Sequence, residues 1–215
     1  VIVDVRGTGA SFGTRNTEFS DAEVADFSAV FDWIVSQPWS NGRLATLGSS
    51  YLGNTAELAA MTSHPALRAV VPRFSDFSAY GQAVRPGGVR NSVIAAAWPA
   101  FIRALDRNDA CAAFMGATAP DCPPNAPWFG GVRPVNGDEA ALARAIAEHA
   151  GNAGLDTILD SLVFSDDSFA GDGDRRITLD AVSPARRWRK IDAANVPAYH
   201  WASWFDGGTA DGVLT

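Results

Sequence analysis

The sequence predicts an α/β fold, a mostly parallel sheet with crossover helices that a helical cap insertion interrupts. Apolar runs of strand length alternate with segments of helical period over residues 1–75, and such short alternation is typical of parallel strands joined by helices. The next strand is predicted only at 196–203. That gap of about 120 residues after the strand at 67–72 is far longer than a crossover needs and predicts the insertion.

Each element follows from its own pattern of apolar and turn-forming residues. Apolar residues at helical spacing predict a helix over 21–36, with Ser20 or Asp21 as its N-cap and Pro38 just beyond its end. From the N-terminus, the predicted core elements are a buried strand at 1–5, a glycine-rich turn at 6–13, the helix at 21–36, a strand at 43–48, a helix at about 52–61 and a strand at 67–72.

The middle of the chain has a different composition. Gly, Pro and Ser are frequent over 73–90, and helical stretches are predicted at 91–106 and 138–164 on either side of a Pro-rich segment. An insertion after the carboxyl end of a strand lies over the site of an α/β sheet. The expected segments are therefore a first core segment (1–75), a cap (76–190) and a second core segment (191–215).

Composition excludes several classes of protein. Apolar residues make up 47% of the chain, charged residues 19%, and the net charge is −7 without a basic run, which argues against disorder, nucleic-acid binding and adhesion to anionic membranes. No apolar stretch approaches the roughly 20 residues of a membrane span. Cys111 and Cys122 could close a disulfide in an exported protein or remain two free thiols, and they lack the spacing of a zinc site.

The chain opens directly in an apolar strand and stops in what reads as the start of an apolar segment, 213–215. We therefore expect a piece of a longer protein, truncated at both ends. An upstream signal peptide would lie outside it, and a secreted or periplasmic location is slightly favoured over a cytoplasmic one.

The strongest local signal is Gly-Ser-Ser-Tyr-Leu-Gly at 48–53, between a predicted strand and a predicted helix. A serine on such a turn projects its hydroxyl above the sheet, small neighbours allow the tight turn, and the helix N-terminus favours negative charge there. Ser50 is the expected nucleophile, and the backbone N–H of Tyr51 is an expected oxyanion donor. The alternative is a serine- and glycine-rich turn without chemistry.

Two details weaken that signal, and a second glycine-rich segment imitates a different motif. The usual G-x-S-x-G pattern has glycine where Leu52 stands, and Gly53 comes one residue later. Ser49 is a rival nucleophile, but Leu47 occupies the position two residues before it, where glycine is expected. Residues 7–13 imitate a dinucleotide fingerprint, yet no helix is predicted to open there, so a turn beside the active site is the better interpretation.

Four segments resemble one family. Residues 4–13 resemble its D-x-R-G-x-G-x-S-x-G segment, residues 32–43 its helix-to-strand connection, residues 48–53 its serine turn with the same displaced glycine, and residues 197–206 its acid-bearing strand and turn. The family is that of the X-Pro dipeptidyl-peptidases and cocaine-esterase-like (CocE/NonD) hydrolases, related to the α-amino acid ester hydrolases. The resemblance implies an α/β-hydrolase core and covers 1–75 and 190–215.

The resemblance also implies roles for particular residues. Ser50 would be the nucleophile, and Asp206 the triad acid that orients a histidine; taken alone, Asp206 in its glycine turn is more often a turn residue. The order of a triad in this fold is serine, acid, histidine, and no histidine follows Asp206. His64 is interpreted as a surface or capping residue, His200 as packed in a strand, and His149 as solvated on a cap helix.

Two further groups of residues carry weaker signals. Asp166, Asp167, Asp172 and Asp174 do not match a calcium-loop pattern, so a solvated loop is favoured. Trp188, Trp201 and Trp204 could partly line an apolar pocket. No metal or organic cofactor is implied.

The function expected is that of a serine hydrolase that cleaves ester or amide (peptide) bonds through an acyl-enzyme intermediate, with its histidine outside this chain. The expected partner is a small ester, an amide or a short peptide, and a homo-oligomer is an open alternative. This chain alone is expected to be inactive. The alternative from another class is a hydrolase-like binding or scaffolding protein that has lost catalysis.

Overall fold

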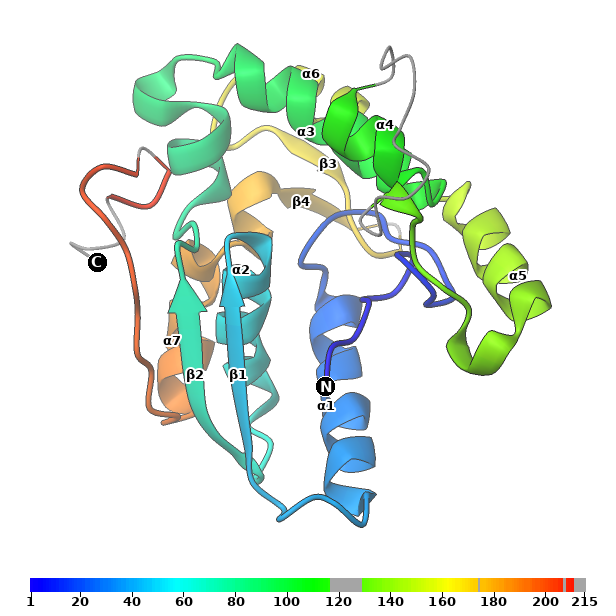
Figure 1. Cartoon of the computed structure of the whole chain (residues 1–215). Coiled ribbons are helices and arrows are strands. Elements are labelled where there is room, and N and C mark those ends of the chain that lie inside the picture. Colours follow the sequence, from blue (N-terminus) through cyan, green and yellow to red (C-terminus); the bar gives the residue numbers. More distant parts are fainter. Residues whose placement is uncertain (117–128, 174, 207, 211–215) are drawn as a thin grey trace. The chain divides into compact units, whose positions relative to one another are not determined.

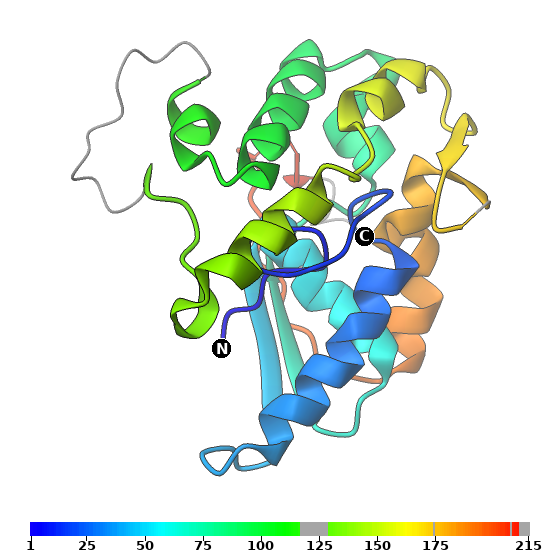
Figure 2. The same cartoon turned by 90° about the vertical axis from the view of Figure 1, so that its right-hand side faces the viewer.

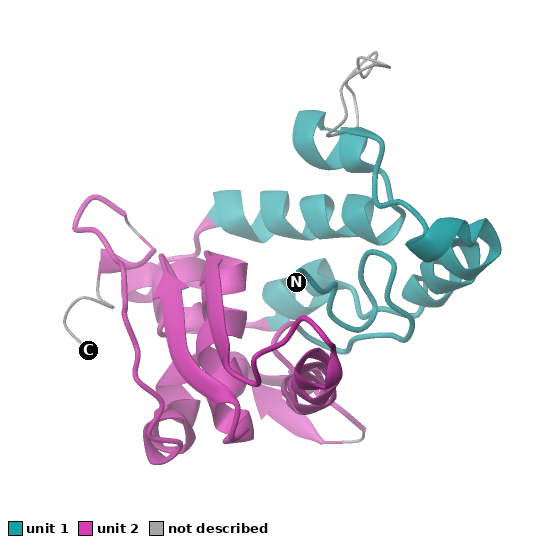
Figure 3. Cartoon of the chain, turned by 60° about the horizontal axis from the view of Figure 1, so that its bottom comes forward, with its two compact units in different colours: residues 1–17, 92–161 teal, residues 18–91, 162–215 magenta. Residues whose placement is uncertain are grey.

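A computed structural model describes all residues except 117–128, 174, 207 and 211–215. The chain forms two compact units, which Figure 3 colours separately. Unit 1 comprises residues 1–17 and 92–161, and unit 2 comprises residues 18–91 and 162–215. The expected cap coincides with neither unit, so the division of the chain into core and cap stays a prediction.

Unit 2 is an α/β unit and contains the predicted sheet. Its helices are α1 (Asp21–Ser36), α2 (Tyr51–Leu58) with the 3-10 turn η1 (Ala59–Thr62), the π-helical turn η2 (Ala79–Val84), the 3-10 turns η3 (Pro86–Gly88) and η6 (Leu179–Val182), and α7 (Pro184–Ala193). Its strands are β1 (Leu44–Ser49), β2 (Leu67–Arg73), β3 (Ser168–Ala170) and β4 (Arg176–Thr178). The elements α1, β1, α2 and β2 therefore lie where the sequence predicts them.

The sheet of β1 and β2 is parallel, as predicted, whereas β3 pairs with β4 antiparallel in a separate two-stranded sheet. β1 pairs with β2 from Leu44↔Leu67 to Ser49↔Arg73. The strand predicted at 196–203 is an extended segment that joins β2 through two isolated parallel bridges, one of which is Arg73↔Trp201. This segment runs beside β2 in Figure 1. The carboxyl ends of all three therefore meet at one edge of the sheet.

Helices cover one face of this sheet. A core of Phe31 from α1, the start of η1 and two residues of β2 packs against the partly buried Ile191 of α7, and Figure 2 shows α1, α2 and α7 on the same side of the strands. Ser20 is the N-cap of α1 and accepts a hydrogen bond from the N–H of Glu23 at 3.1 Å, which decides between the two predicted caps.

The buried strand predicted at 1–5 is wrong. These residues are irregular, and the side chains of Val1, Ile2 and Val3 are exposed. A β-branched run becomes a strand only when another strand pairs with it, and among the described residues none does. The segment instead folds back on itself, because the Asp4 carboxylate accepts a hydrogen bond from the N–H of Ala10.

Unit 1 is helical where it has regular structure. It contains α3 (Ser92–Asp106), α4 (Ala110–Met115), the 3-10 turn η5 (Val135–Gly137), α5 (Glu139–His149) and α6 (Leu155–Ser161). The single helical stretch predicted over 138–164 is broken, because Asn152 turns its side chain to the N-terminal loop instead of continuing the helix. Its amide donates to the Gly7 carbonyl and accepts from the N–H of Arg15.

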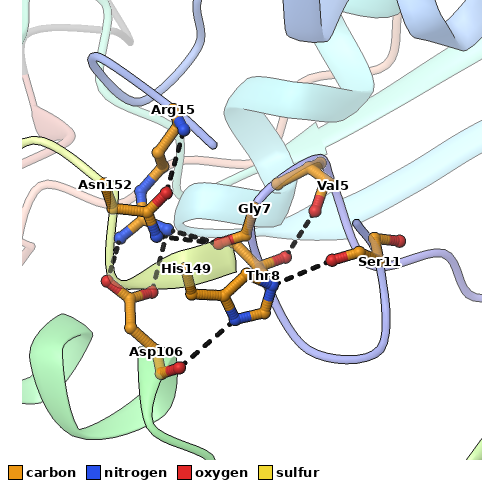
Figure 4. A network of polar contacts seen from close by, with 8 residues as sticks. All are labelled: Val5, Gly7, Thr8, Ser11, Arg15, Asp106, His149 and Asn152. Atoms are coloured by element: carbon orange, nitrogen blue, oxygen red, sulfur yellow. Dashed lines mark hydrogen bonds and ion pairs between the residues drawn. The ribbon is translucent and has the colours of Figure 1, made fainter. Parts of the chain in front are cut away.

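A buried polar network ties this loop to α3 and α5 (Figure 4). The guanidinium of Arg15 makes two hydrogen bonds of 2.8 and 2.9 Å to the Asp106 carboxylate. The ring nitrogens of His149 lie 2.8 Å from the Ser11 carbonyl and 3.2 Å from the Asp106 carbonyl. His149 is therefore buried rather than solvated, contrary to the prediction: helical period alone does not show that a loop covers that face of α5.

Candidate active site

The turn at Ser50 has the backbone expected of a nucleophile. Ser50 has φ 59° and ψ −128°, a conformation that residues other than glycine rarely adopt. Its N–H donates to the Arg73 carbonyl at 2.9 Å, which ties the turn to the end of β2. Ser50 precedes α2, but its side chain makes no capping hydrogen bond and the residue is exposed. The strained position thus presents a hydroxyl that the helix does not use.

Two glycines make this turn possible. A Cβ at Gly48 would lie 2.0 Å from the Leu52 carbonyl oxygen, and one at Gly53 would lie 2.5 Å from the Arg73 carbonyl oxygen. Leu52 is 59% exposed. The geometry therefore explains the displaced glycine, because the crowded position is 53, where α2 crosses the end of β2, whereas position 52 faces open space.

Ser49 has a different backbone from its neighbour. It is the last residue of β1 and pairs with Arg73 in the sheet. Positive φ is found at Ser50 and not at Ser49. Both serines are exposed, so it is the backbone, not exposure, that distinguishes the two hydroxyls.

Tyr51 begins α2, at the end of the helix where the backbone N–H groups have no intrahelical acceptor. The side chain of Tyr51 contacts residues at and just before the start of α1. The phenol lies 3.3 Å from both carboxylate oxygens of Glu23, and the ring packs on Phe19. These contacts fix Tyr51 at the helix N-terminus, where the helix dipole favours an anion.

Asp206 lies in a turn after the extended segment that pairs with β2. Its carboxylate accepts a hydrogen bond from the N–H of Gly208 at 3.0 Å, and its carbonyl accepts from the N–H of Ala210. Asp206 thus follows one strand as Ser50 follows another, at the shared carboxyl edge of the sheet.

Asp76 is a carboxylate at this edge that the sequence analysis missed. It lies three residues beyond β2, and the buried side chain of Asn54 holds its backbone. Burial and, second, the negative charge of Asp206 raise the pKa of Asp76 to about 6. Its position just after a predicted parallel strand was the signal available, because such positions converge at one edge.

A cavity of about 560 Å³ lies beside α2, α7 and the extended segment, within unit 2. Its lining includes Glu57, His200, Trp188 and Trp201. Burial raises the pKa of Glu57 to about 7 and lowers the pKa of His200. Two of the three tryptophans singled out from the sequence therefore border a pocket, whereas Trp204 is exposed and does not.

The histidines have structural surroundings. In His64 the Nδ1 atom accepts the N–H of Ala66, just before β2, and the Nε2 atom lies 3.1 Å from the Asp32 carboxylate. Both ring nitrogens of His149 contact carbonyls of unit 1. Within the described part of unit 2, no histidine is hydrogen-bonded to Ser50 or Asp206.

The acidic loop at 166–174 has local partners. Asp167 accepts the N–H groups of Val163 and Phe164, and Asp172 accepts the N–H of Ala22 at the start of α1. Asp174 and Cys122 lie outside the described residues. Cys111 is disulfide-bonded, so the alternative of a free thiol at Cys111 is wrong. Among the residues that are described, no cluster of His, Cys, Asp or Glu could hold a metal ion. The described helices are all too short or too polar to cross a membrane.

The family model for X-Pro dipeptidyl-peptidase (S15 family) matches residues 1–215. Proteins from Mycobacterium bovis and Mycobacterium tuberculosis that carry the name serine esterase are 38% identical over 100% of this chain and 36% of their own length. The cocaine esterase of a Rhodococcus strain is 33% identical over 47% of this chain and 18% of its own. The chain thus spans about a third of the mycobacterial relatives.

A solved structure is also similar. It is a CocE/NonD family hydrolase from Staphylococcus aureus, with a TM-score of 0.48 and 22% identity, and the match covers 76% of this chain and 22% of that one.

Proposed function

The chain belongs to the X-Pro dipeptidyl-peptidase (S15) family of hydrolases, and from that premise we propose that it supplies the nucleophile and the acid of a serine hydrolase. Ser50 attacks the carbonyl of an ester or amide, the scissile bond breaks to release the alcohol or amine, and water hydrolyses the resulting acyl-enzyme to the carboxylic acid and free Ser50. The observation that carries this proposal is the backbone of Ser50, held at φ 59° between β1 and α2 with its hydroxyl unused by the helix.

The other groups take roles from their places at the same edge. The backbone N–H of Tyr51 binds the oxyanion that forms when the carbonyl is attacked. Asp206 orients a histidine, and this histidine removes the proton of Ser50. Asp206 also stabilises the imidazolium that forms. In the order of this fold that histidine comes after the acid in the chain, so His64, His149 and His200 are not the base.

The substrate class follows from the family. The chain contributes to cleavage of a small ester, an amide or a short peptide, by analogy with relatives named serine esterase, cocaine esterase and X-Pro dipeptidyl-peptidase. The core has the α/β-hydrolase arrangement, with residues 76–190 as its cap. The mechanism requires no metal or organic cofactor.

The test uses the full-length protein and a fluorophosphonate probe. Wild type is labelled at Ser50, Ser50→Ala is not labelled, and the matched variant Ser49→Ala is labelled like wild type. Hydrolysis of p-nitrophenyl acetate follows the same pattern, with a loss of about a thousandfold or more in Ser50→Ala. Labelling that survives Ser50→Ala and disappears in Ser49→Ala would overturn the assignment.

A further inference from the structure

Two carboxylates from different segments converge beside the proposed catalytic turn. A Cβ built on Gly208 would lie 3.3 Å from an oxygen of Asp76 and 3.6 Å from an oxygen of Asp206. Asp76 follows β2, and Asp206 follows the segment that pairs with β2. The two acids, 130 residues apart in the sequence, thus face the same small space at the carboxyl edge of the sheet.

Asp76 is held at this place through its backbone. The Asn54 amide donates to the Asp76 carbonyl at 2.7 Å and accepts from the Asp76 N–H at 3.2 Å. Asn54 is 2% exposed and lies on α2, four residues after Ser50. The helix that begins at the nucleophile therefore also sets the position of Asp76, and it does so without using the carboxylate.

The carboxylate of Asp76 has no structural partner among the described residues. None of them donates a hydrogen bond to it or forms an ion pair with it. The Arg73 guanidinium lies 5.8 Å from the centre of the Trp201 ring and Glu57 borders the cavity further along α2, and neither of them shifts the pKa of Asp76. Asp206 is the one charged group that shifts the pKa of Asp76.

Such an arrangement is unfavourable for folding alone. Two like charges close together, one of them partly buried, repel each other and destabilise the native state unless something else benefits. Paired carboxylates whose pKa values are pushed apart are common at sites of catalysis. In this protein the destabilising repulsion involves Asp206, the acid that would face the histidine.

We propose that Asp76 is a positioning residue that acts through Asp206 by adding negative charge beside the triad acid. The proposal rests on the proposed function. The ionised Asp76 strengthens the field that Asp206 exerts on the histidine, so the imidazolium formed during acyl transfer is better stabilised and the histidine is a stronger base. Asp76 does not touch the substrate or the reacting atoms.

The test is the pH dependence of kcat/KM of the full-length protein with p-nitrophenyl acetate. The base must be unprotonated to act, so its pKa sets the acid limb. Asp76→Asn removes a negative charge and keeps the backbone bonds to Asn54. The pKa of the base then falls, and the acid limb moves to lower pH by roughly half to one unit. The plateau of kcat falls severalfold, while the melting temperature does not decrease.

Asp76→Glu is the conservative variant, and it restores the acid limb toward wild type because it restores the charge. Asp166→Asn is the matched control, an exposed aspartate of unit 2, and it leaves the profile unchanged. A merely structural role for Asp76 would change stability without moving the acid limb.

Three results would overturn the inference. One is an Asp76→Asn profile that superimposes on those of wild type and Asp166→Asn. Another is the same displaced limb in Asp76→Asn and Asp76→Glu, which would show that charge is not the cause. The third is activity that survives Asp206→Asn but not Asp76→Asn, which would make Asp76 itself the triad acid. Failure of the proposed function is a separate result, namely full turnover in Ser50→Ala.

Discussion

The turn at Ser50 and the network around Arg15 use polar residues in opposite ways. At the turn, a strained backbone presents a hydroxyl that caps nothing and stays exposed. In the network, Arg15 is 4% exposed, and it binds the Asp106 carboxylate with both guanidinium arms and also the Gly7 carbonyl. A buried polar group with all its partners holds a fold together. A group held in strain with a free functional end is the better candidate for chemistry.

The largest effect separating the two regions is expected from Ser50→Gly. Activity falls about a thousandfold or more, because the nucleophile is lost. Stability rises by roughly 1 kcal/mol, because glycine adopts the positive φ without strain. Urea unfolding and p-nitrophenyl acetate hydrolysis of the full-length protein measure both. Ser49→Gly is the control, which keeps activity and loses stability, since glycine weakens a strand. A stability loss in Ser50→Gly would mean that the turn is not strained.

The network should show the reverse, a loss of stability. Asp106→Asn leaves the buried Arg15 guanidinium without a counter-charge and costs roughly 3–5 kcal/mol in the free energy of unfolding. The exposed pair Arg103–Asp156 provides the control, with side chains 46% and 49% exposed. Asp156→Asn costs less than about 1 kcal/mol. An equal loss of unfolding free energy in Asp106→Asn and Asp156→Asn would show that burial does not make one ion pair more important for stability than the other.

The packing of the nucleophile turn is tested at its glycines. Gly48→Ala places a methyl group against the Leu52 carbonyl, a backbone atom that cannot move aside, and costs about 3 kcal/mol. Gly42→Ala is the control: it has φ +75° but nothing within 4 Å, so it carries only the strain of a positive φ, roughly 1 kcal/mol. Thermal unfolding of both variants gives the comparison. A larger loss at Gly42 would mean that contact with α2 does not constrain the turn.

What the sequence predicts well is local. The helix at 21–36 and strands β1 and β2 follow from apolar spacing and capping, which need no knowledge of distant residues. Burial and pairing depend on the whole chain. Composition predicts a strand over 1–5, but a strand requires a partner. The helical period of 138–164 predicts a solvated His149, because it does not show the loop that covers this side chain.

The same limit applies to the candidate site. Ser50 and Asp206 were found through motifs, whose residues are close together in the sequence. Asp76 has no motif, and its proximity to Asp206 arises only because the segment at 197–201 pairs with β2. The sheet brings Asp76 to the candidate site, and the rule that the carboxyl ends of parallel strands converge could have predicted this position.

Glu57 sharpens the comparison, because none of the described cations pairs with this buried carboxylate as Arg15 does with Asp106. It lies on α2, 9% exposed, and burial raises its pKa from 4.5 to about 7. A raised native pKa means that the folded state binds the proton more tightly than the unfolded state does. The contribution of Glu57 to stability is therefore fully present below about pH 4.5 and is lost as the pH rises through 7. The loss over this window amounts to roughly 2–3 kcal/mol.

Glu57→Gln removes this titration. The variant is expected to be more stable than wild type at pH 8 and of similar stability at pH 4.5, because the neutral amide resembles the protonated acid in size and polarity. Urea unfolding of the full-length protein at both pH values measures the difference. Asp166→Asn provides the exposed carboxylate for comparison and shows no such divergence. If Glu57→Gln were destabilising at pH 8, the carboxylate would be ionised and paired in the native protein. Glu57 would then stabilise the fold through a partner, as Asp106 does.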